Sequence, residues 1–182
     1  NAYAIGAVDF TGDMPIILGP DGPSLGGFVC PFVIIQADLW KAGQLAPGDT
    51  VRFAVVSDEE AVAAEKAQDA LVAGAPAIPL PAPARKIESP ILGIIEAEGH
   101  RPRAVYRRQG DRHLLVEYGP IVLDLELRLR IHALMLELQA MALPGVIDIT
   151  PGIRSLQVHY DSRVLSQAEL LRALTEAEDR LG

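Results

Sequence analysis

The stretch LDLELRLRIHALMLELQAMAL, residues 123–143, decides the fold class because it fits either a strand or a helix. Its first half alternates apolar and polar side chains, as a half-buried strand does. However, Asp124 precedes Arg128 by four positions, in the acid-first order that favours a helix, and Glu126 and Arg130 repeat this spacing. So long a stretch without a turn residue would also be an improbable strand. We therefore predict a helix with one apolar face, formed by Leu123, Leu127, Ile131, Leu134, Leu138 and Met141.

The segments around this helix complete a small α+β unit. Two strands are predicted before it, on either side of the hairpin signal Gln109-Gly110-Asp111, at 104–108 and 113–118. After Pro144-Gly145 ends the helix, two more strands are predicted at 146–150 and 155–160. Ser166-Gln-Ala-Glu169 has the form of a capping box and opens a last helix. The order predicts a ferredoxin-like β-α-β-β-α unit that lacks its final strand.

The first half of the chain is predicted to be β-rich. Short strands at 14–18, 28–36 and 50–56 are joined by turns of glycine and proline, with a two-turn helix at 37–43. Pro31 lies inside the second strand, which favours an edge position or a bulge. Such strands are typical of part of a barrel or a sandwich.

A helix and a proline-rich segment are predicted between the two halves. Ser57-Asp-Glu-Glu60 has the form of a capping box, and an alanine-rich surface helix follows it as far as Gly74. Four prolines in residues 75–84 predict an exposed, extended linker. We therefore expect a β-rich part at 1–57, a helix and linker at 58–90, and the ferredoxin-like domain at 91–182.

Composition restricts the class of protein. A formal charge of −8 argues against a nucleic-acid partner, and the five arginines within residues 101–112 are interpreted as the solvated face of a hairpin. No apolar run is long enough to predict a membrane span. A single cysteine gives no disulfide framework, which favours a cytoplasmic location. Because the chain begins at Asn1 without a methionine, we expect it to be a piece of a longer protein.

The loop GPDGPSLGGFVCP, residues 19–31, combines backbone-special residues with a hydroxyl, a carboxylate and the single thiol. Glycine permits positive φ and close approach of a ligand, and proline fixes φ, so this composition predicts a tight, preorganised loop. The same residues build any elaborate turn, so a binding loop and a plain turn remain open.

Most other chemistry-bearing residues favour structural roles. Cys30 lies in an apolar stretch and is interpreted as an inert thiol. The four histidines show no metal-ligand spacing. The loop lacks the lysine of a phosphate-binding loop, and Ser24 has no activating base at catalytic spacing.

Two long parts of the chain resemble known families. Residues 9–31 and 39–49, which include Asp9-Phe-Thr-Gly-Asp13 and the glycine-rich loop, resemble the end of the allophanate hydrolase subunit 2 family. Residues 106–119 and 143–161, which include Leu143-Pro-Gly-Val-Ile-Asp148, resemble the start of the subunit 1 family. Both are also known as Kip-type proteins. Subunit 2 followed by subunit 1 in one chain resembles the carboxyltransferase domain of urea carboxylases, which are often part of a urea amidolyase.

This resemblance implies a biotin-dependent ligase reaction in urea degradation. In such enzymes, a biotin carboxylase domain that uses ATP and Mg loads carbon dioxide onto biotin on a carrier domain. The carboxyltransferase domain then transfers the carboxyl group to urea, which gives allophanate. Its site lies between two cyclophilin-like barrels, and the subunit 1 family begins with a ferredoxin-like domain.

The chain departs from a complete enzyme of this kind. It contains no ATP-binding domain and no Met-Lys-Met biotinylation motif, and it would hold only part of the first barrel. We therefore expect it to bind no cofactor by itself and to be inactive in isolation. Its expected partners are the biotin carboxylase and carrier domains of the same polypeptide, together with urea, with no nucleic acid and no membrane.

The resemblance and the chemistry of carboxyl transfer suggest substrate-binding residues in the loop. A carboxylate orients urea amino groups by accepting their hydrogen bonds, and backbone amides stabilise developing oxyanions. The candidates are Asp21, Ser24, Gly26 and Gly27; no catalytic residue is assigned, and no metal is expected.

Two other functions share these families. A Kip-type regulatory or binding module would act on a sensor kinase, and a 5-oxoprolinase subunit would act on a different amide. Separate or differently ordered subunits would favour these alternatives, whereas the fused order favours urea carboxylase. Urea, guanidine and other small amides remain open as substrates.

Overall fold

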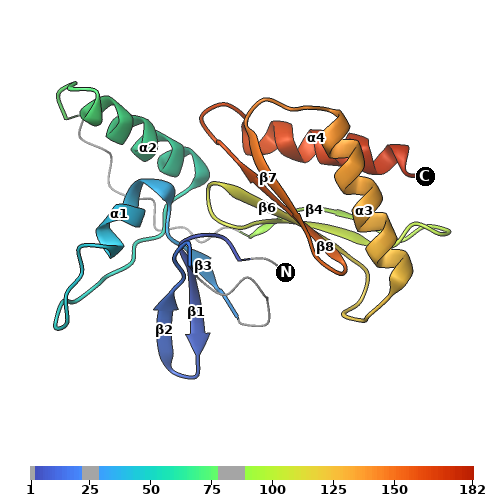
Figure 1. The fold of residues 1–182 in the computed structure, drawn as a ribbon, viewed down its shortest axis with the longest axis horizontal. Helices are drawn as coiled ribbons and strands as arrows, with labels where there is room; N and C mark the ends of the chain where they lie inside the picture. Colours follow the sequence, from blue (N-terminus) through green and yellow to red (C-terminus); the bar gives the residue numbers. More distant parts are fainter. Residues whose placement is uncertain (1–2, 22–28, 78–88) are drawn as a thin grey trace.

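The computed structural model describes residues 3–21, 29–77 and 89–182. Within them the chain is α+β, with two antiparallel sheets and four α-helices (Figure 1). The elements are β1 (Ala7–Thr11), β2 (Met14–Ile17), β3 (Phe32–Val33), the 3₁₀-helix η1 (Gln36–Asp38), α1 (Leu39–Ala42), α2 (Asp58–Val72), β4 (Ile91–Ile95), β5 (Ala104–Arg108), β6 (His113–Tyr118), α3 (Leu125–Ala140), β7 (Val146–Pro151), β8 (Ser155–Tyr160) and α4 (Gln167–Arg180). No helix among the described residues has the length and apolar composition needed to cross a membrane.

The second half forms a five-stranded sheet in the order β4-β5-β6-β8-β7. β8 lies between β6 and β7, which α3 connects, so the predicted order of strand, helix, strand, strand, helix is confirmed. α4 is the last element among the described residues, and β5, paired with β6 in the predicted hairpin, occupies the position beside β6 that the final strand of a ferredoxin-like unit would fill.

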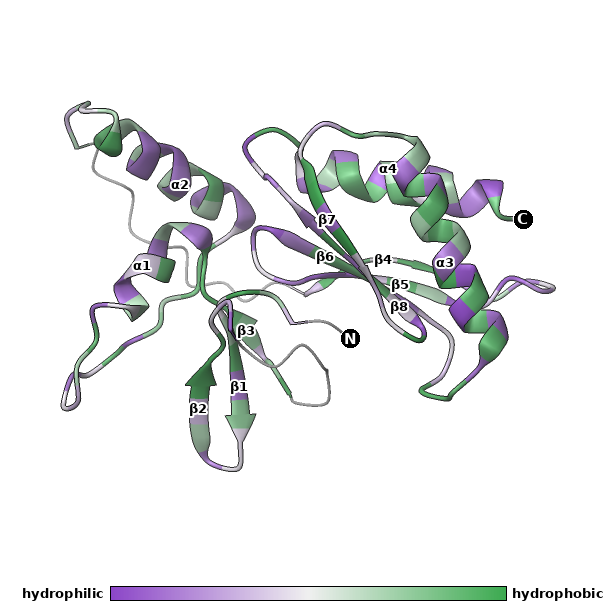
Figure 2. Ribbon diagram, viewed as in Figure 1, coloured by the Kyte–Doolittle hydropathy of each residue, from purple (hydrophilic) through white to green (hydrophobic). Residues whose placement is uncertain are grey.

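The main core lies between this sheet and its two helices, which cover one face of it (Figure 1). Alternate residues of β5, β6 and β8 point into the core, as a pleated strand requires. Figure 2 shows apolar residues along the strands and in stripes on α3 and α4. The largest fully buried side chains include Tyr106, Tyr118, Tyr160, Leu114, Ile131, Leu134, Leu138, Leu156, Leu170 and Leu174.

Helix α3 forms as predicted, although its charged residues act differently. Asp124 is the N-cap, and its carboxylate accepts hydrogen bonds from the backbone N–H groups of Glu126 and Leu127 at 2.7 and 3.3 Å. Arg130 does not pair along the helix but reaches the fully buried Glu178 of α4. The i,i+4 spacing therefore predicted the helix correctly, although Asp124 caps this helix and Arg130 pairs with a residue of another helix.

The first half forms a smaller sheet in the order β2-β1-β3, of which the sequence predicted β2 and β3. Strand β1 was missed, as was β4 in the larger sheet. The predicted strand at 28–36 was too long: the described part is a strand only at Phe32–Val33 and turns into η1 at Gln36. β3 is an edge strand, as Pro31 indicated.

The predicted strand at 50–56 was wrong. Val51, Phe53 and Val55 alternate, but the segment has no hydrogen-bonded neighbouring strand among the described residues. The ring of Phe53 packs instead against that of Phe32, with centroids 5.0 Å apart. Alternation predicts a strand only where a partner strand is present.

Helix α2 begins at the predicted capping box and ends before Gly74, which has a φ of +88°. The Ser57 Oγ accepts a hydrogen bond from the Glu60 N–H, and the Glu60 carboxylate accepts one from the Ser57 N–H. The expected surface position holds only in part, because Ala61 and Glu65 are buried. Most of the predicted linker lies outside the described residues.

Candidate functional site

The loop predicted to bind substrate connects the two edge strands of the smaller sheet. It leaves β2 after Ile17, which pairs with Val8 of β1, and returns beside Phe10, whose N–H donates to the Val29 carbonyl at 3.2 Å. Asp21 lies at the beginning of the loop and is exposed. The other three candidates, Ser24, Gly26 and Gly27, lie outside the described residues.

Asp9, in the middle of β1, is a candidate that sequence reasoning missed. Asp9 is 2% exposed, and within residues 3–21, 29–77 and 89–182 its Oδ1 has no hydrogen-bond partner. A buried carboxylate oxygen without a donor is costly and uncommon. The sequence does contain a signal for this residue. Aspartate is depleted inside strands, and Asp9 nevertheless follows the apolar residues Ala7 and Val8.

Cys30 lies close to Asp9, immediately before β3 rather than inside it. Burial raises the pKa of the Cys30 thiol, and the negative charge of Asp9 raises this pKa further. A raised pKa keeps the thiol protonated, and the thiol is not the nucleophilic form. The structure therefore agrees with the interpretation of Cys30 as an inert residue.

Two of the four histidines form a stacked pair on the face of the larger sheet that is opposite α3 and α4. The rings of His113 and His159 are 4.4 Å apart and inclined by 12°. Burial lowers the pKa of His113 to about 3, and burial followed by the charge of Arg112 lowers that of His159. Across residues 3–21, 29–77 and 89–182, no group of three potential ligands could hold a metal ion.

The arginine cluster at 101–112 is not an open cationic face. Its members contact acceptors within the protein: Arg101 contacts Asp179, Arg103 contacts Glu96, Arg107 contacts Glu117, Arg108 contacts Gln167, and Arg112 contacts Glu65. The interpretation as a solvated face was wrong for Arg112, which is buried. The structure therefore provides no basic surface for an anionic polymer here.

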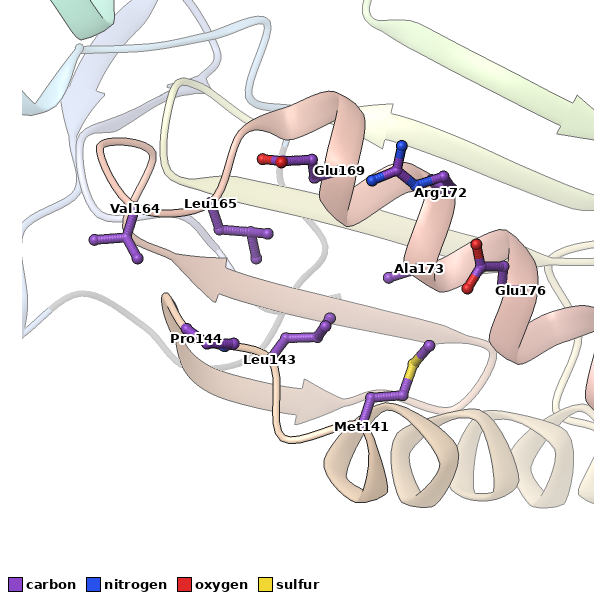
Figure 3. Close-up of a pocket in the computed structure, with 9 residues that line it drawn as sticks. All are labelled: Met141, Leu143, Pro144, Val164, Leu165, Glu169, Arg172, Ala173 and Glu176. Carbon is purple, nitrogen blue, oxygen red and sulfur yellow. The ribbon is translucent and has the colours of Figure 1, made fainter.

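A hollow of about 340 Å³ opens between α4 and the connection from α3 to β7 (Figure 3). Apolar side chains of this connection face Glu169, Arg172 and Glu176 of α4. Glu169 is already used as a capping residue. The hollow has no nucleophile beside a general base, and none of the predicted site residues lines it.

Comparisons with known proteins assign the two halves separately. Residues 1–55 match the family described as carboxyltransferase domain, subdomain A and B, and residues 104–181 match carboxyltransferase domain, subdomain C and D. The urea amidolyase of Saccharomyces cerevisiae is 36% identical over 98% of this chain, which spans 10% of that protein.

Two solved structures extend this likeness to the fold. The Kluyveromyces lactis urea amidolyase has a TM-score of 0.93 at 36% identity, covering 100% of this chain and 11% of its own. The Kluyveromyces lactis urea carboxylase has a TM-score of 0.92 at 36% identity, covering 100% of this chain and 16% of its own. The matches to both pairs of subdomains, together with the likeness to these relatives along the whole chain, identify it as a carboxyltransferase segment of the urea amidolyase and urea carboxylase family.

Proposed function

We propose that this chain is part of the carboxyltransferase domain of a biotin-dependent urea carboxylase that makes allophanate from urea. One observation carries the proposal: the whole chain, in one continuous order, follows the fold of urea carboxylase and urea amidolyase structures. We further propose that the smaller sheet belongs to a cyclophilin-like barrel, with the parts divided at 57 and 90.

The rest of the reaction belongs to other parts of the proposed parent enzyme. A biotin carboxylase domain would use ATP and Mg, and a carrier domain would present the carboxylated biotin, in the cytoplasm. Carboxybiotin would supply the carboxyl group, and the residues proposed below would hold the urea that receives it. No residue of this chain is assigned to biotin.

The substrate site proposed for this chain combines Asp9 with the loop. Urea is rich in N–H donors, and the unpartnered Oδ1 of Asp9 needs a donor. Asp21 would accept from the other amino group, and Ser24 with the amides of Gly26 and Gly27 would stabilise the negative charge of the transferred carboxylate. These residues bind and orient the nucleophile, and holding the reactants together supplies much of the rate enhancement.

The proposal is tested in the full-length parent with Asp9→Asn, Asp21→Asn and Ser24→Ala. We expect each to slow urea-dependent turnover by about 10²-fold or more, because an amide lacks the negative charge of the carboxylate and a methyl group cannot form a hydrogen bond. Biotin-dependent ATP cleavage, which uses another domain, should be unchanged. Asp13→Asn, an exposed residue in the β1–β2 turn, is the matched control. Wild-type turnover in all three variants would contradict the site.

A separate test concerns the isolated chain. We propose that it does not carboxylate urea even when carboxylated carrier is supplied, because the near-attack geometry requires walls from both barrels. Formation of allophanate by residues 1–182 alone, measured with labelled bicarbonate, would contradict this expectation.

A further inference from the structure

The turn between β5 and β6, residues 109–112, joins the two halves of the chain. Three consecutive residues of this turn contact three different elements of the first half: Gly110 meets β3, Asp111 meets η1, and Arg112 meets α2. Figure 1 shows the turn projecting from the sheet toward these elements. We propose that residues 109–112 are a recognition element that holds residues 3–77 on residues 89–182 without a covalent connection between them.

Gly110 provides the close approach to β3. Its φ is +72°, a conformation that side chains rarely adopt. A Cβ at this position would lie 2.8 Å from Cγ1 of Val33, which is closer than a real contact allows. Gly110 is therefore required for two reasons: the turn needs its positive φ, and a side chain at this position would collide with Val33 of β3.

Asp111 caps a helix that belongs to the other half. The Gln36 N–H, at the first position of η1, donates to Oδ2 of Asp111 at 3.0 Å and to Oδ1 at 3.3 Å. The residue before η1, Ile35, offers no side-chain cap, so an acceptor 75 positions away supplies it. A carboxylate at a helix N-terminus is also favoured by the helix dipole.

Arg112 forms a buried ion pair with α2. Arg112 is 8% exposed and Glu65 is 4% exposed, and the guanidinium donates to both carboxylate oxygens, with an Nε–Oε2 distance of 3.3 Å. Asp161, after β8, lies 3.4 Å from the same guanidinium. The pair is therefore surrounded by protein and has little access to water.

Arg163 extends this ion pair into a network. Its guanidinium contacts Asp69 of α2 as well as Asp161, at 2.7 Å, and lies 3.7 Å from Glu65. The hydrogen bond from Arg163 is the main reason that the pKa of Asp161 is lowered to about 2. Two arginines of the second half thus face two carboxylates of α2, so the two surfaces are complementary in charge as well as in shape.

These contacts make separation of the halves costly. Separation would expose a close-packed glycine turn, leave η1 uncapped, and break the ion pairs of Arg112 with Glu65 and of Arg163 with Asp69. In the assembled chain, removing one partner of the Arg112–Glu65 pair would leave an uncompensated buried charge, so single substitutions of this pair should be strongly destabilising. The inference does not depend on the reaction proposed above, because it concerns only how the two halves recognise each other.

The test uses the full chain with a specific protease site inserted within residues 78–88. The folded chain is cut, and its oligomeric state is followed by size-exclusion chromatography and native mass spectrometry during dilution. We expect the cut wild-type chain to remain one complex with the mass of the intact chain. Two separate pieces at micromolar concentration would overturn the proposal.

Substitutions then test the turn itself. Arg112→Glu should weaken the cut complex by about a hundredfold or more, because it sets like charges against Glu65. The double variant Arg112→Glu with Glu65→Arg should recover at least tenfold of this loss. Arg103→Glu, at an exposed pair with Glu96 in the same half, is the matched control and should leave the complex intact.

A second variant covers the case in which Arg112→Glu does not fold before cleavage. Asp111→Ala removes the cap of η1 but no residue of the main core, and it should weaken the cut complex about tenfold. Circular dichroism of each uncut variant verifies that the strands and helices are present. Wild-type affinity in both Arg112→Glu and Asp111→Ala would overturn the assignment of residues 109–112.

Discussion

The two sheets of this chain differ in how completely the chain buries their side chains. The five-stranded sheet packs against α3 and α4, and its inward-facing residues lie in one continuous core. The three-stranded sheet leaves Phe10, Met14 and Ile16 exposed. A pattern of apolar residues therefore predicts most elements of the second half, all but β4, because each of these elements buries its face against another element with the same kind of pattern.

The largest expected effect is at the buried carboxylate of the second half. Glu178 is fully buried and accepts hydrogen bonds from the Tyr118 hydroxyl and from Arg130. Glu178→Ala removes the carboxylate that accepts from the buried Tyr118 hydroxyl and from the partly buried Arg130 guanidinium, so the free energy of unfolding should fall by about 3–5 kcal/mol. Urea denaturation measures this fall. Glu176→Ala, on the exposed side of the same helix, should change it by less than about 0.5 kcal/mol.

The next prediction compares apolar residues in the two sheets directly. Leu134 of α3 is 0% exposed, and truncation to alanine should cost about 2–5 kcal/mol because it leaves a cavity. Ile16 of β2 is 42% exposed, and the same truncation should cost less than about 1 kcal/mol. Equal losses of unfolding free energy in the two variants would contradict the expectation that Ile16 contributes less to stability than Leu134.

Much of the second half could be predicted from the sequence because its signals are local. The strands at 104–108, 113–118 and 155–160 and the box at Ser166 and Glu169 are found as predicted. Each depends on alternation, on a turn residue or on a capping pair a few positions apart. Such signals do not require knowledge of distant partners.

What could not be predicted depends on contacts between distant residues. The segment at 50–56 has the right alternation but no partner strand among the described residues, and the cap of η1 at Gln36 comes from Asp111, 75 positions away. The loop candidates were named from chemistry and resemblance, and of these four only Asp21 lies within the described residues. Asp9 was missed because a buried, unpartnered oxygen becomes visible only in the folded structure.

Acid should destabilise the larger sheet through its histidine pair. The pKa of His113 is about 3 in the folded protein, against about 6.5 when unfolded, so the folded state binds fewer protons. Stability is therefore complete above pH 6.5 and falls as the pH falls toward 3. Groups near this pair include Arg112, Asp148 and Asp161, and they alter the shift at His159.

The expected size of this acid effect is about 2 kcal/mol between pH 6.5 and pH 5. Urea denaturation at several pH values measures it, and His113→Gln should flatten the profile because the amide does not titrate. His132→Gln, on α3, is the matched control. A profile that is equally steep in His113→Gln and in the wild type would assign the loss of stability to other groups.

The smallest expected effects are at the two capping boxes, which have the same chemistry in different surroundings. The N–H of Glu60 donates to Ser57 at 3.2 Å, and that of Glu169 donates to Ser166 at 3.3 Å. Each serine-to-alanine change should cost about 1 kcal/mol. Because α4 contributes Leu170 and Leu174 to the main core, Ser166→Ala should lower the global stability.

Ser57→Ala should act more locally, because α2 buries only Ala61 and Glu65. Amide hydrogen exchange should accelerate about fivefold in residues 58–72, with little change in α3 and α4. Ser57→Asp and Ser166→Asp, which restore a capping oxygen, should return each helix to wild-type exchange. Faster exchange throughout the chain in Ser57→Ala would instead show that α2 unfolds only together with the larger sheet. The two halves would then differ less in stability than their burial indicates.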